Sequence, residues 1–160
     1  MQKIIISPYS KPLLNGKTNA KNFPSWQELV ALLIQKGYEV IQVGSPGEEI
    51  ISGTSSVVLG APLSSLQELV KEALTWISVD NFFPHFATIV CHKPGIVLWG
   101  KSDPSIFGYP SNFNLLKSKD NLRKEQFKYW EDEEYDPSVF VSSESVVKVL
   151  EENFSHAHTE

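Results

Sequence analysis

The chain has 160 residues, with 14 lysines and arginines against 19 aspartates and glutamates, and 41% of its residues are apolar. This length and composition predict one packed domain, residues 1–160, and exclude collagen-like and disordered chains. The net charge of −5 argues against nucleic acid as a partner, because a nucleic-acid binder needs a basic surface. The single cysteine, Cys91, indicates a reducing compartment, and no segment is predicted to span a membrane, so we expect a cytoplasmic protein.

Short apolar runs alternate with helical patterns along the whole chain. Residues 4–6 are all isoleucine, which is typical of a strand that is buried on both faces of a parallel sheet. Ser25 with Glu28, and Ser65 with Glu68, have the spacing of a capping box at a helix start. The predicted strands are 4–6, 38–43, 57–59, 75–79, 95–99 and 114–116. The predicted helices are 25–36, a short one from Glu48, one from Ser65, 84–92, 122–129 and 143–153.

This alternation predicts an α/β fold, a single Rossmann-like open parallel sheet of about six strands with helices on both faces. We expect a core over 1–116, a helical extension over 117–154 and a frayed tail over 155–160. The acidic run 131–136 is expected to be a solvated loop, and His156 and His158 belong to the tail. If the strand order is 3-2-1-4-5-6, a ligand binds outside the carboxyl ends of strands one and four, next to Ser7, Ser10 and Asp80.

Several common active-site motifs do not occur in the sequence. The phosphate-binding loop G-x-x-x-x-G-K-[ST], the dinucleotide motif G-x-G-x-x-G and the nucleophile motif G-x-S-x-G are all missing. Cys91 lies among apolar residues of a predicted helix, which favours a buried, inert thiol over a nucleophile.

The segment from Asp80 to Ala87 joins the end of a strand to the start of a helix. It places an acid, an amide and an imidazole (Asp80, Asn81 and His85) beside backbone N–H groups that suit a phosphate or diphosphate. The structural alternative is equally open: Asp80 caps the helix and His85 packs under a loop.

Other candidates follow neighbouring strands or precede the first helix. Gly100 permits close approach of a ligand and Lys101 supplies a positive charge, although the same residues suit a plain surface turn. Lys21 can direct an ammonium to the same place or remain solvated. Glu48 can accept hydrogen bonds from ribose hydroxyls or serve as a helix-capping charge.

Five segments together resemble a known family. In chain order they are Lys21-Asn22-Phe23-Pro24, Gly44-Ser45-Pro46-Gly47-Glu48, Ser65-Leu66-Gln67-Glu68-Leu69, Ile77 to Asn81 with His85-Phe86-Ala87, and Leu98 to Pro104. Over residues 1–116 the chain is similar to the C-terminal, nucleotide-sugar-binding half of the ADP-heptose:lipopolysaccharide heptosyltransferases, which have the two-domain GT-B glycosyltransferase fold.

The resemblance implies roles for individual residues. Lys21 corresponds to a lysine that contacts the phosphates of the sugar donor, and Glu48 to a glutamate that contacts the nucleoside. Asp80, Asn81 and His85 fall in the loop that surrounds the diphosphate and the sugar. Phe82 stands where the family has glycine, and Asn81 replaces a hydroxyl residue. The family's N-terminal acceptor domain has no counterpart ahead of residue 1, so the resemblance implies an acceptor-binding domain in trans.

The function expected from these observations is a glycosyltransferase-like domain that binds a nucleotide diphosphate sugar, resembling ADP-heptose, without a metal cofactor. Transfer then requires a partner that holds the acceptor. The alternatives are a non-catalytic nucleotide-binding module and a degenerate domain that acts through protein contacts, with Phe82, Phe83 and Phe86 in its surface. Because this cleft face would meet the N-terminal domain in the resembled family, we also expect it to be covered by self-association.

Overall fold

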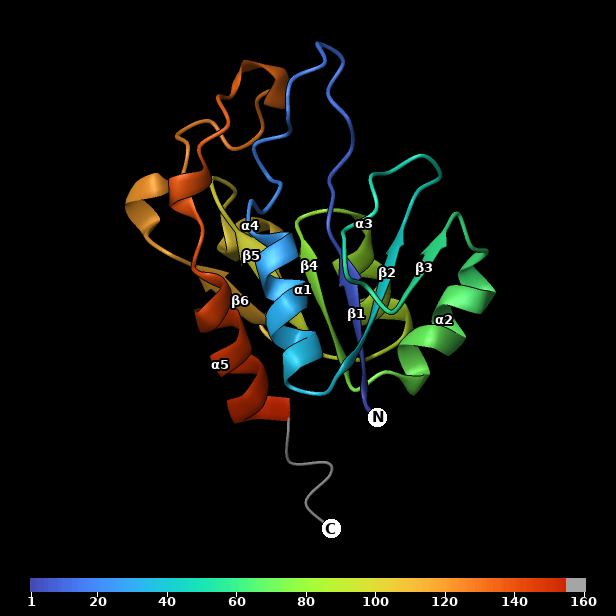
Figure 1. The fold of residues 1–160 in the computed structure, drawn as a ribbon. Helices are drawn as coiled ribbons and strands as arrows, with labels where there is room; N and C mark the ends of the chain where they lie inside the picture. Colours follow the sequence, from blue (N-terminus) through green and yellow to red (C-terminus); the bar gives the residue numbers. More distant parts are fainter. Residues whose placement is uncertain (155–160) are drawn as a thin grey trace.

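Six strands form one parallel sheet in the computed structural model, which describes residues 1–154 (Figure 1). The strands are β1 (Lys3–Ser7), β2 (Glu39–Gly44), β3 (Ser56–Leu59), β4 (Thr75–Val79), β5 (Ile96–Trp99) and β6 (Phe113–Leu116). Their order across the sheet is β3-β2-β1-β4-β5-β6, and every neighbouring pair is parallel. The predicted fold class and strand order are confirmed.

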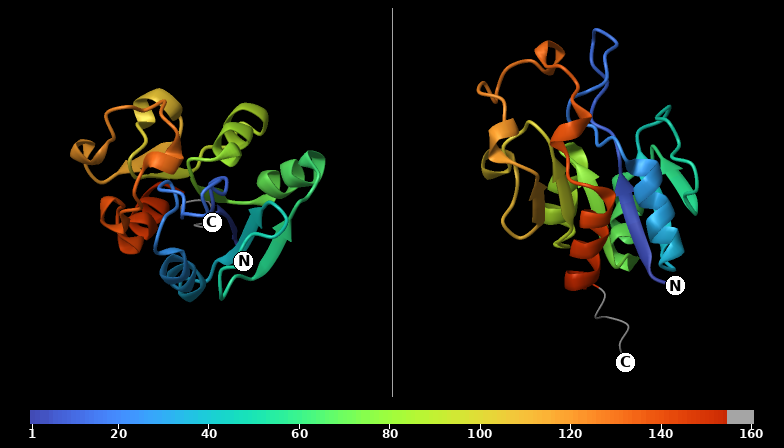
Figure 2. Two further views of the ribbon diagram at one scale, coloured as in Figure 1. Left: turned by 90° about the horizontal axis from the view of Figure 1, so that it is seen from above. Right: turned by 60° about the vertical axis from the view of Figure 1, so that its left-hand side comes forward.

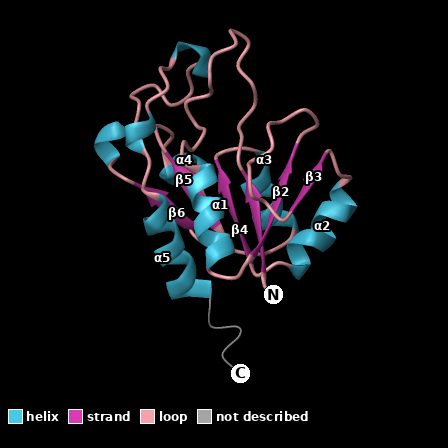
Figure 3. Cartoon of the chain, viewed as in Figure 1, coloured by secondary structure: helices cyan, strands magenta, loops and turns pink. Residues whose placement is uncertain are grey.

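Helices cover both faces of this sheet, as Figure 2 shows from above. They are α1 (Trp26–Gln35), α2 (Leu63–Glu72), α3 (Phe82–His85), α4 (Pro104–Phe107) and α5 (Ser143–Phe154). α1 and α5 lie side by side on one face, while α2 and α3 cover the other. Long loops extend beyond the carboxyl ends of the strands, and this end of the sheet is therefore the one built from irregular structure (Figure 3).

The alternation of side chains along β1 divides the core into two layers. Ile4 and Ile6 pack beneath α1 and α5, whereas Ile5 packs beneath α2 and α3, and all three are fully buried. Burial on both faces is what a run of β-branched residues predicts for a central parallel strand. The core thus fixes the two central strands, β1 and β4, whose carboxyl ends carry the candidate ligand-binding residues.

Two predicted helices do not form. The helix expected from Glu48 is replaced by a loop, because the buried side chain of Gln42 takes its backbone groups. Gln42 Nε2 donates to Glu49 O (2.9 Å), and Gln42 Oε1 accepts from Ile51 N (2.8 Å). The helix expected over 122–129 is also wrong, since that segment is irregular, between short 3₁₀ turns at Lys119–Asn121 and Trp130–Asp132.

The helix expected over 84–92 begins earlier and is split in two. Asn81 caps α3 by accepting a hydrogen bond from Phe83 N (2.9 Å), and a π-helical turn, Phe86–Val90, follows. Cys91 therefore ends this turn and does not lie inside a helix. It is half-buried, and burial raises the pKa of its thiol, which favours the inert form.

Neither predicted capping box is present. The side chain of Ser25 makes no capping bond to α1, and α2 begins at Leu63, directly after Pro62, so Ser65 lies inside that helix. His156 and His158, expected in the tail, lie outside the described residues. No helix within residues 1–154 has the length and apolar character that crossing a bilayer requires.

Candidate functional site

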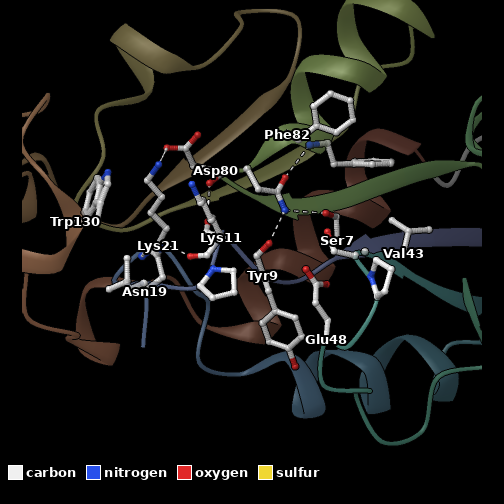
Figure 4. Close-up of a pocket in the computed structure, with 18 of the residues that line it drawn as sticks. Ser7, Tyr9, Lys11, Asn19, Lys21, Val43, Glu48, Asp80, Phe82 and Trp130 are labelled. Carbon is white, nitrogen blue, oxygen red and sulfur yellow. Dashed lines mark hydrogen bonds and ion pairs between the residues drawn. The ribbon is translucent and has the colours of Figure 1, made fainter. Parts of the chain in front are cut away.

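A cleft of about 830 Å³ opens at the carboxyl ends of β1, β2, β3 and β4. Its walls come from the β1–α1 loop (residues 8–25), the turns that follow β2 and β3, the β4–α3 junction and residues 128–131 (Figure 4). The cleft includes the point between β1 and β4 where the strand order reverses, which is where ligands bind in open parallel sheets. Six of the nine residues proposed from the sequence line it: Ser7, Ser10, Lys21, Glu48, Asp80 and Asn81.

Asn81 joins the ends of β1 and β4 at the floor of the cleft. Its Nδ2 donates to Ser7 Oγ (2.8 Å) and to Tyr9 O (3.0 Å). Its Oδ1 accepts from Phe83 N (2.9 Å) and from Ser78 Oγ (3.1 Å). Both ends of the amide are therefore occupied by protein groups, and the first role of Asn81 is to hold the floor together. This residue, and not Asp80, caps the helix.

Ser10 makes a second bridge between the same two strand ends. Its Oγ donates to Asp80 O (2.7 Å), and its backbone N–H donates to Asn22 Oδ1 (2.8 Å). The hydroxyl is buried in these contacts. Ser10 thus positions the loop that carries Lys21 relative to the end of β4.

Lys21 and Asp80 form an ion pair at this end of the cleft, with 3.2 Å between Nζ and Oδ2 (Figure 4). The side chains are only 22% and 10% exposed, so solvent screens the pair less than it would at a surface. Asn19 supports the lysine backbone, because its Oδ1 accepts from Lys21 N (3.0 Å). An ammonium held here can meet an anionic group of a ligand only by sharing or leaving Asp80.

Glu48 occupies the other end of the cleft, beside the turn after β2 (Figure 4). Its Oε1 is buried and has no hydrogen-bond partner. Burial raises the pKa of this carboxyl, and a backbone hydrogen bond at Ser45 acts weakly in the other direction. Gly44 makes room for it, since a Cβ at that position would collide with the carboxylate. An unpartnered buried carboxylate oxygen is a ready acceptor for a hydroxyl of a ligand.

Tyr9 and Phe82 are two of the aromatic residues that line the cleft. Burial, with Glu49 and Glu48 nearby, raises the pKa of Tyr9 to about 12, so its phenol stays protonated at neutral pH. Phe82, which stands where the resembled family has glycine, is 59% exposed and stacks on Phe86 with 5.8 Å between ring centroids. Its backbone and ring form part of the cleft rim.

The segment 123–134, which we call the strap, contains none of the site residues proposed from the sequence. Trp130 of the strap lines the cleft next to Lys21, with Nζ 5.0 Å from the ring centroid (Figure 4). The guanidinium of Arg123 stacks on the same ring at 3.4 Å. Their only signal in the sequence is a tryptophan directly before the acidic run with an arginine seven residues ahead of it, and no spacing rule links this pair to Lys21.

The strap is joined to the β1–α1 loop across the top of the cleft, where both segments approach each other in Figure 1. Glu131 Oε2 accepts from Leu14 N (3.0 Å), and Asn15 Nδ2 donates to Glu131 O (3.1 Å). Glu133, also of the expected solvated run, pairs with Lys101 (3.0 Å). The expectation of a solvated acidic loop is therefore wrong for these two glutamates, which are half-buried.

Three sequence candidates do not line the cleft. His85 Nδ1 lies 2.6 Å from the hydroxyl of Tyr109, so it packs beside a loop. Lys101 is engaged by Glu133 and donates to Glu134 O (2.8 Å). Gly100 is required by packing, because a Cβ there would meet the ring of Phe140. Within residues 1–154 no three histidine, cysteine, aspartate or glutamate side chains gather as a metal site would need.

The sequence matches no family model and no curated protein. The structure matches E. coli heptosyltransferase WaaC with ADP, at a TM-score of 0.64 and 19% identity, over 95% of this chain and 44% of that one. The fold is that of one half of a heptosyltransferase.

Other solved structures agree. A glycosyl transferase of family 9 from Veillonella parvula matches at a TM-score of 0.73 and 18% identity, over 98% of this chain and 47% of that one. E. coli ADP-heptose lipopolysaccharide heptosyltransferase II matches at 0.60 and 16% identity, over 94% and 47%. The chain spans less than half the length of these enzymes and corresponds to their C-terminal-like half, so the resemblance seen in the sequence is confirmed for the fold.

Proposed function

We propose that this domain binds the donor of a sugar transfer, a nucleotide diphosphate sugar resembling ADP-heptose, and that an acceptor-binding domain in trans completes the reaction. The observation that carries the proposal is the pairing, in one cleft at the reversal of strand order, of a lysine at one end and, at the other, a glutamate with one buried carboxylate oxygen that has no partner. Two structures of the same fold support it, because their ligands are ADP and ADP-D-beta-D-heptose.

The chemistry of the two ends suits the two parts of such a ligand. Glu48 accepts hydrogen bonds from the ribose hydroxyls, which satisfies the oxygen that is otherwise without a partner. Lys21 meets the diphosphate and stabilises the negative charge that grows on it as the bond to the sugar breaks. The acceptor hydroxyl attacks the anomeric carbon, and its proton passes to a base on the acceptor-binding domain. No step in this scheme uses a metal ion.

A second candidate is a domain that acts mainly through protein contacts. The observation in its favour is a rim of exposed apolar side chains around the cleft: Leu14, Leu63, Phe82 and Tyr129. The two functions are compatible, since an acceptor-binding domain must meet this rim. Self-association through the same rim is part of the proposal, and TibC, a heptosyltransferase of the same fold, is dodecameric. The cytoplasm is the proposed location, on the single cysteine.

The proposal is tested by calorimetric titration of the purified chain with ADP, UDP, GDP and their sugar derivatives. We expect saturable binding of one nucleotide, and a 10- to 100-fold loss of affinity in Lys21→Ala, about 1–3 kcal/mol for a charged hydrogen bond. Lys36→Ala is the matched control, because Lys36 also pairs with an acid, Glu151, but away from the cleft. Absence of binding by every nucleotide contradicts donor binding.

A further inference from the structure

The strap is built around one guanidinium. Arg123 NH2 donates to Gln126 O (3.1 Å) and Lys128 O (2.6 Å), and NH1 donates to Tyr129 O (3.4 Å). Glu133 adds an ion pair at 3.7 Å. The side chain is only 6% exposed, and the rigid planar fork of an arginine suits several acceptors at fixed positions. Arg123 therefore fixes the path of the strap.

The same guanidinium fixes the ring of Trp130. A distance of 3.4 Å between Cζ and the ring centroid is van der Waals contact, so the cation stacks on the indole face. The strap is held from outside as well, because Glu131, the next residue, bonds to the backbone of Leu14. Trp130 is thus held by contacts on both sides of it in the sequence, and its position does not depend on Lys21.

Lys21 has the opposite character. Its ammonium ends a flexible four-carbon stem that can reach many positions unless other groups define one. Two groups define it in this structure: Asp80 Oδ2 at 3.2 Å and the Trp130 ring at 5.0 Å. The carboxylate alone leaves the ammonium free to swing around it, whereas an aromatic face together with a carboxylate defines a single place at the end of β4 (Figure 4).

We propose that Trp130 is a positioning residue, whose ring, fixed by Arg123, holds the Lys21 ammonium at the β4 end of the cleft. The use of that ammonium for a nucleotide diphosphate rests on the proposed function. The placement itself does not, since it follows from contacts within this chain. When an anionic ligand replaces Asp80 as the partner of Lys21, the Trp130 ring keeps the ammonium at the same place.

The first test measures how accessible the lysine is, with no nucleotide present. Trace acetylation with acetic anhydride, read by mass spectrometry, gives the reactivity of Lys21 relative to Lys148, an exposed lysine on α5. We expect Trp130→Met to raise this ratio about 3- to 10-fold, and Trp130→Phe, which retains a π face, to stay near the wild type. An unchanged ratio in Trp130→Met overturns the proposal.

Phe127→Leu is the matched control, because Phe127 lies in the strap, contacts Phe107 and is not among the residues lining the cleft. We expect its Lys21 ratio to equal that of the wild type. If it rises as much as in Trp130→Met, any loosening of the strap frees the lysine, and a specific role for Trp130 is overturned. A variant that unfolds is recognised by the loss of its cooperative thermal melt. If Trp130→Met fails this check, Trp130→Leu, which also lacks a π face, takes its place, and an unchanged Lys21 ratio in it overturns the proposal.

The second test uses ADP and separates positioning from packing. We expect Trp130→Met to weaken ADP binding about 3- to 10-fold when Lys21 is present. In a Lys21→Met background we expect the same change to weaken it less than 2-fold, because the ring then has no ammonium to position. Equal losses in both backgrounds overturn positioning. If the wild type does not bind ADP, the proposed function fails at that point, while the acetylation ratios still decide whether Trp130 places Lys21.

Discussion

The two ends of the cleft differ in how their polar groups are used. At the β4 end, Asn81, Ser10 and the Lys21–Asp80 pair are all bonded to other protein groups. At the β2 end, the Glu48 carboxylate keeps a buried oxygen with no partner. At the β4 end, which we call the rigid end, a ligand must displace a protein partner that is already bound. At the β2 end, which we call the open end, a hydrogen-bond acceptor is free, and burying it costs free energy of desolvation. One cleft therefore combines an end whose polar groups are already bonded to protein with an end that has an acceptor without a partner.

Asn81→Ala tests the rigid end and should have the largest effect. The change removes bonds to Ser7, Tyr9 and Phe83, and it leaves the Phe83 N–H at the start of α3 without its cap. We expect the free energy of unfolding to fall by about 2–3 kcal/mol in urea titrations. Asn153→Ala is the control, because Asn153 donates one exposed bond within α5, and a similar loss there would refute the special role of Asn81.

Asp80→Asn tests whether the ion pair must exchange its partner. The amide keeps the shape of the carboxylate but no longer competes for the ammonium. We expect unfolding free energy to fall by about 1 kcal/mol, while ADP binds about 3- to 10-fold more tightly because Lys21 is released for the phosphates. Denaturation and calorimetry measure the two effects. Weaker ADP binding would show instead that the Asp80 carboxylate itself contacts the ligand.

Glu48→Gln tests the open end, and its effect on stability should be the smallest. Burial raises the pKa of Glu48, so the folded state holds the proton more tightly than the unfolded chain. Stability is then lost as the pH rises from the ordinary pKa through the raised one, and it is not recovered at higher pH. We expect the glutamine variant to exceed the wild type by less than about 1 kcal/mol at pH 7, with the difference vanishing at acid pH.

The same variant should bind nucleotide with lower affinity, because a glutamine oxygen accepts weaker hydrogen bonds from ribose hydroxyls than a carboxylate does. A gain in stability with a loss of affinity is the expected signature. Glu49→Gln is the control, since Glu49 is exposed, and it should change neither quantity. If thermal melts over a range of pH show no difference between Glu48→Gln and the wild type, the cost of burying this carboxylate is contradicted.

Much of the sheet could be predicted because its signals are local. Burial on both faces leaves a run of β-branched residues such as 4–6, and the predicted strand over 75–79 coincides with β4 (Thr75–Val79). The location of the cleft followed from the strand order alone, since the reversal between β1 and β4 brings Ser7 and Asp80 to one edge. Roles for individual side chains, in contrast, depended on the resemblance.

The strap could not be predicted because its path is set by hydrogen bonds from a side chain to the backbone, which leave no periodic pattern in the sequence. A helix over 122–129 needs backbone amides to donate to carbonyls four residues earlier. A side chain in a helix is directed toward the N-terminus, so Arg123 could not reach the carbonyls of Gln126, Lys128 and Tyr129 if this segment were helical. In the irregular path the guanidinium binds all three. The spacing of apolar residues in the sequence gives no sign of these side-chain hydrogen bonds. The expectation that Glu133 is solvated failed because its ion-pair partners, Lys101 and Arg123, lie outside the acidic run.

The bond between Leu14 and Glu131 joins residues that are 117 positions apart in the chain. During synthesis at roughly 5–20 residues per second, Leu14 is made about 6–23 seconds before its partner. The first five strands are made before residue 100, but the upper wall of the cleft cannot close until residue 131 has been added. The Lys21 end of a nascent cleft is therefore exposed before Trp130 has been made to hold the lysine, and this wall is the last part of the cleft to form.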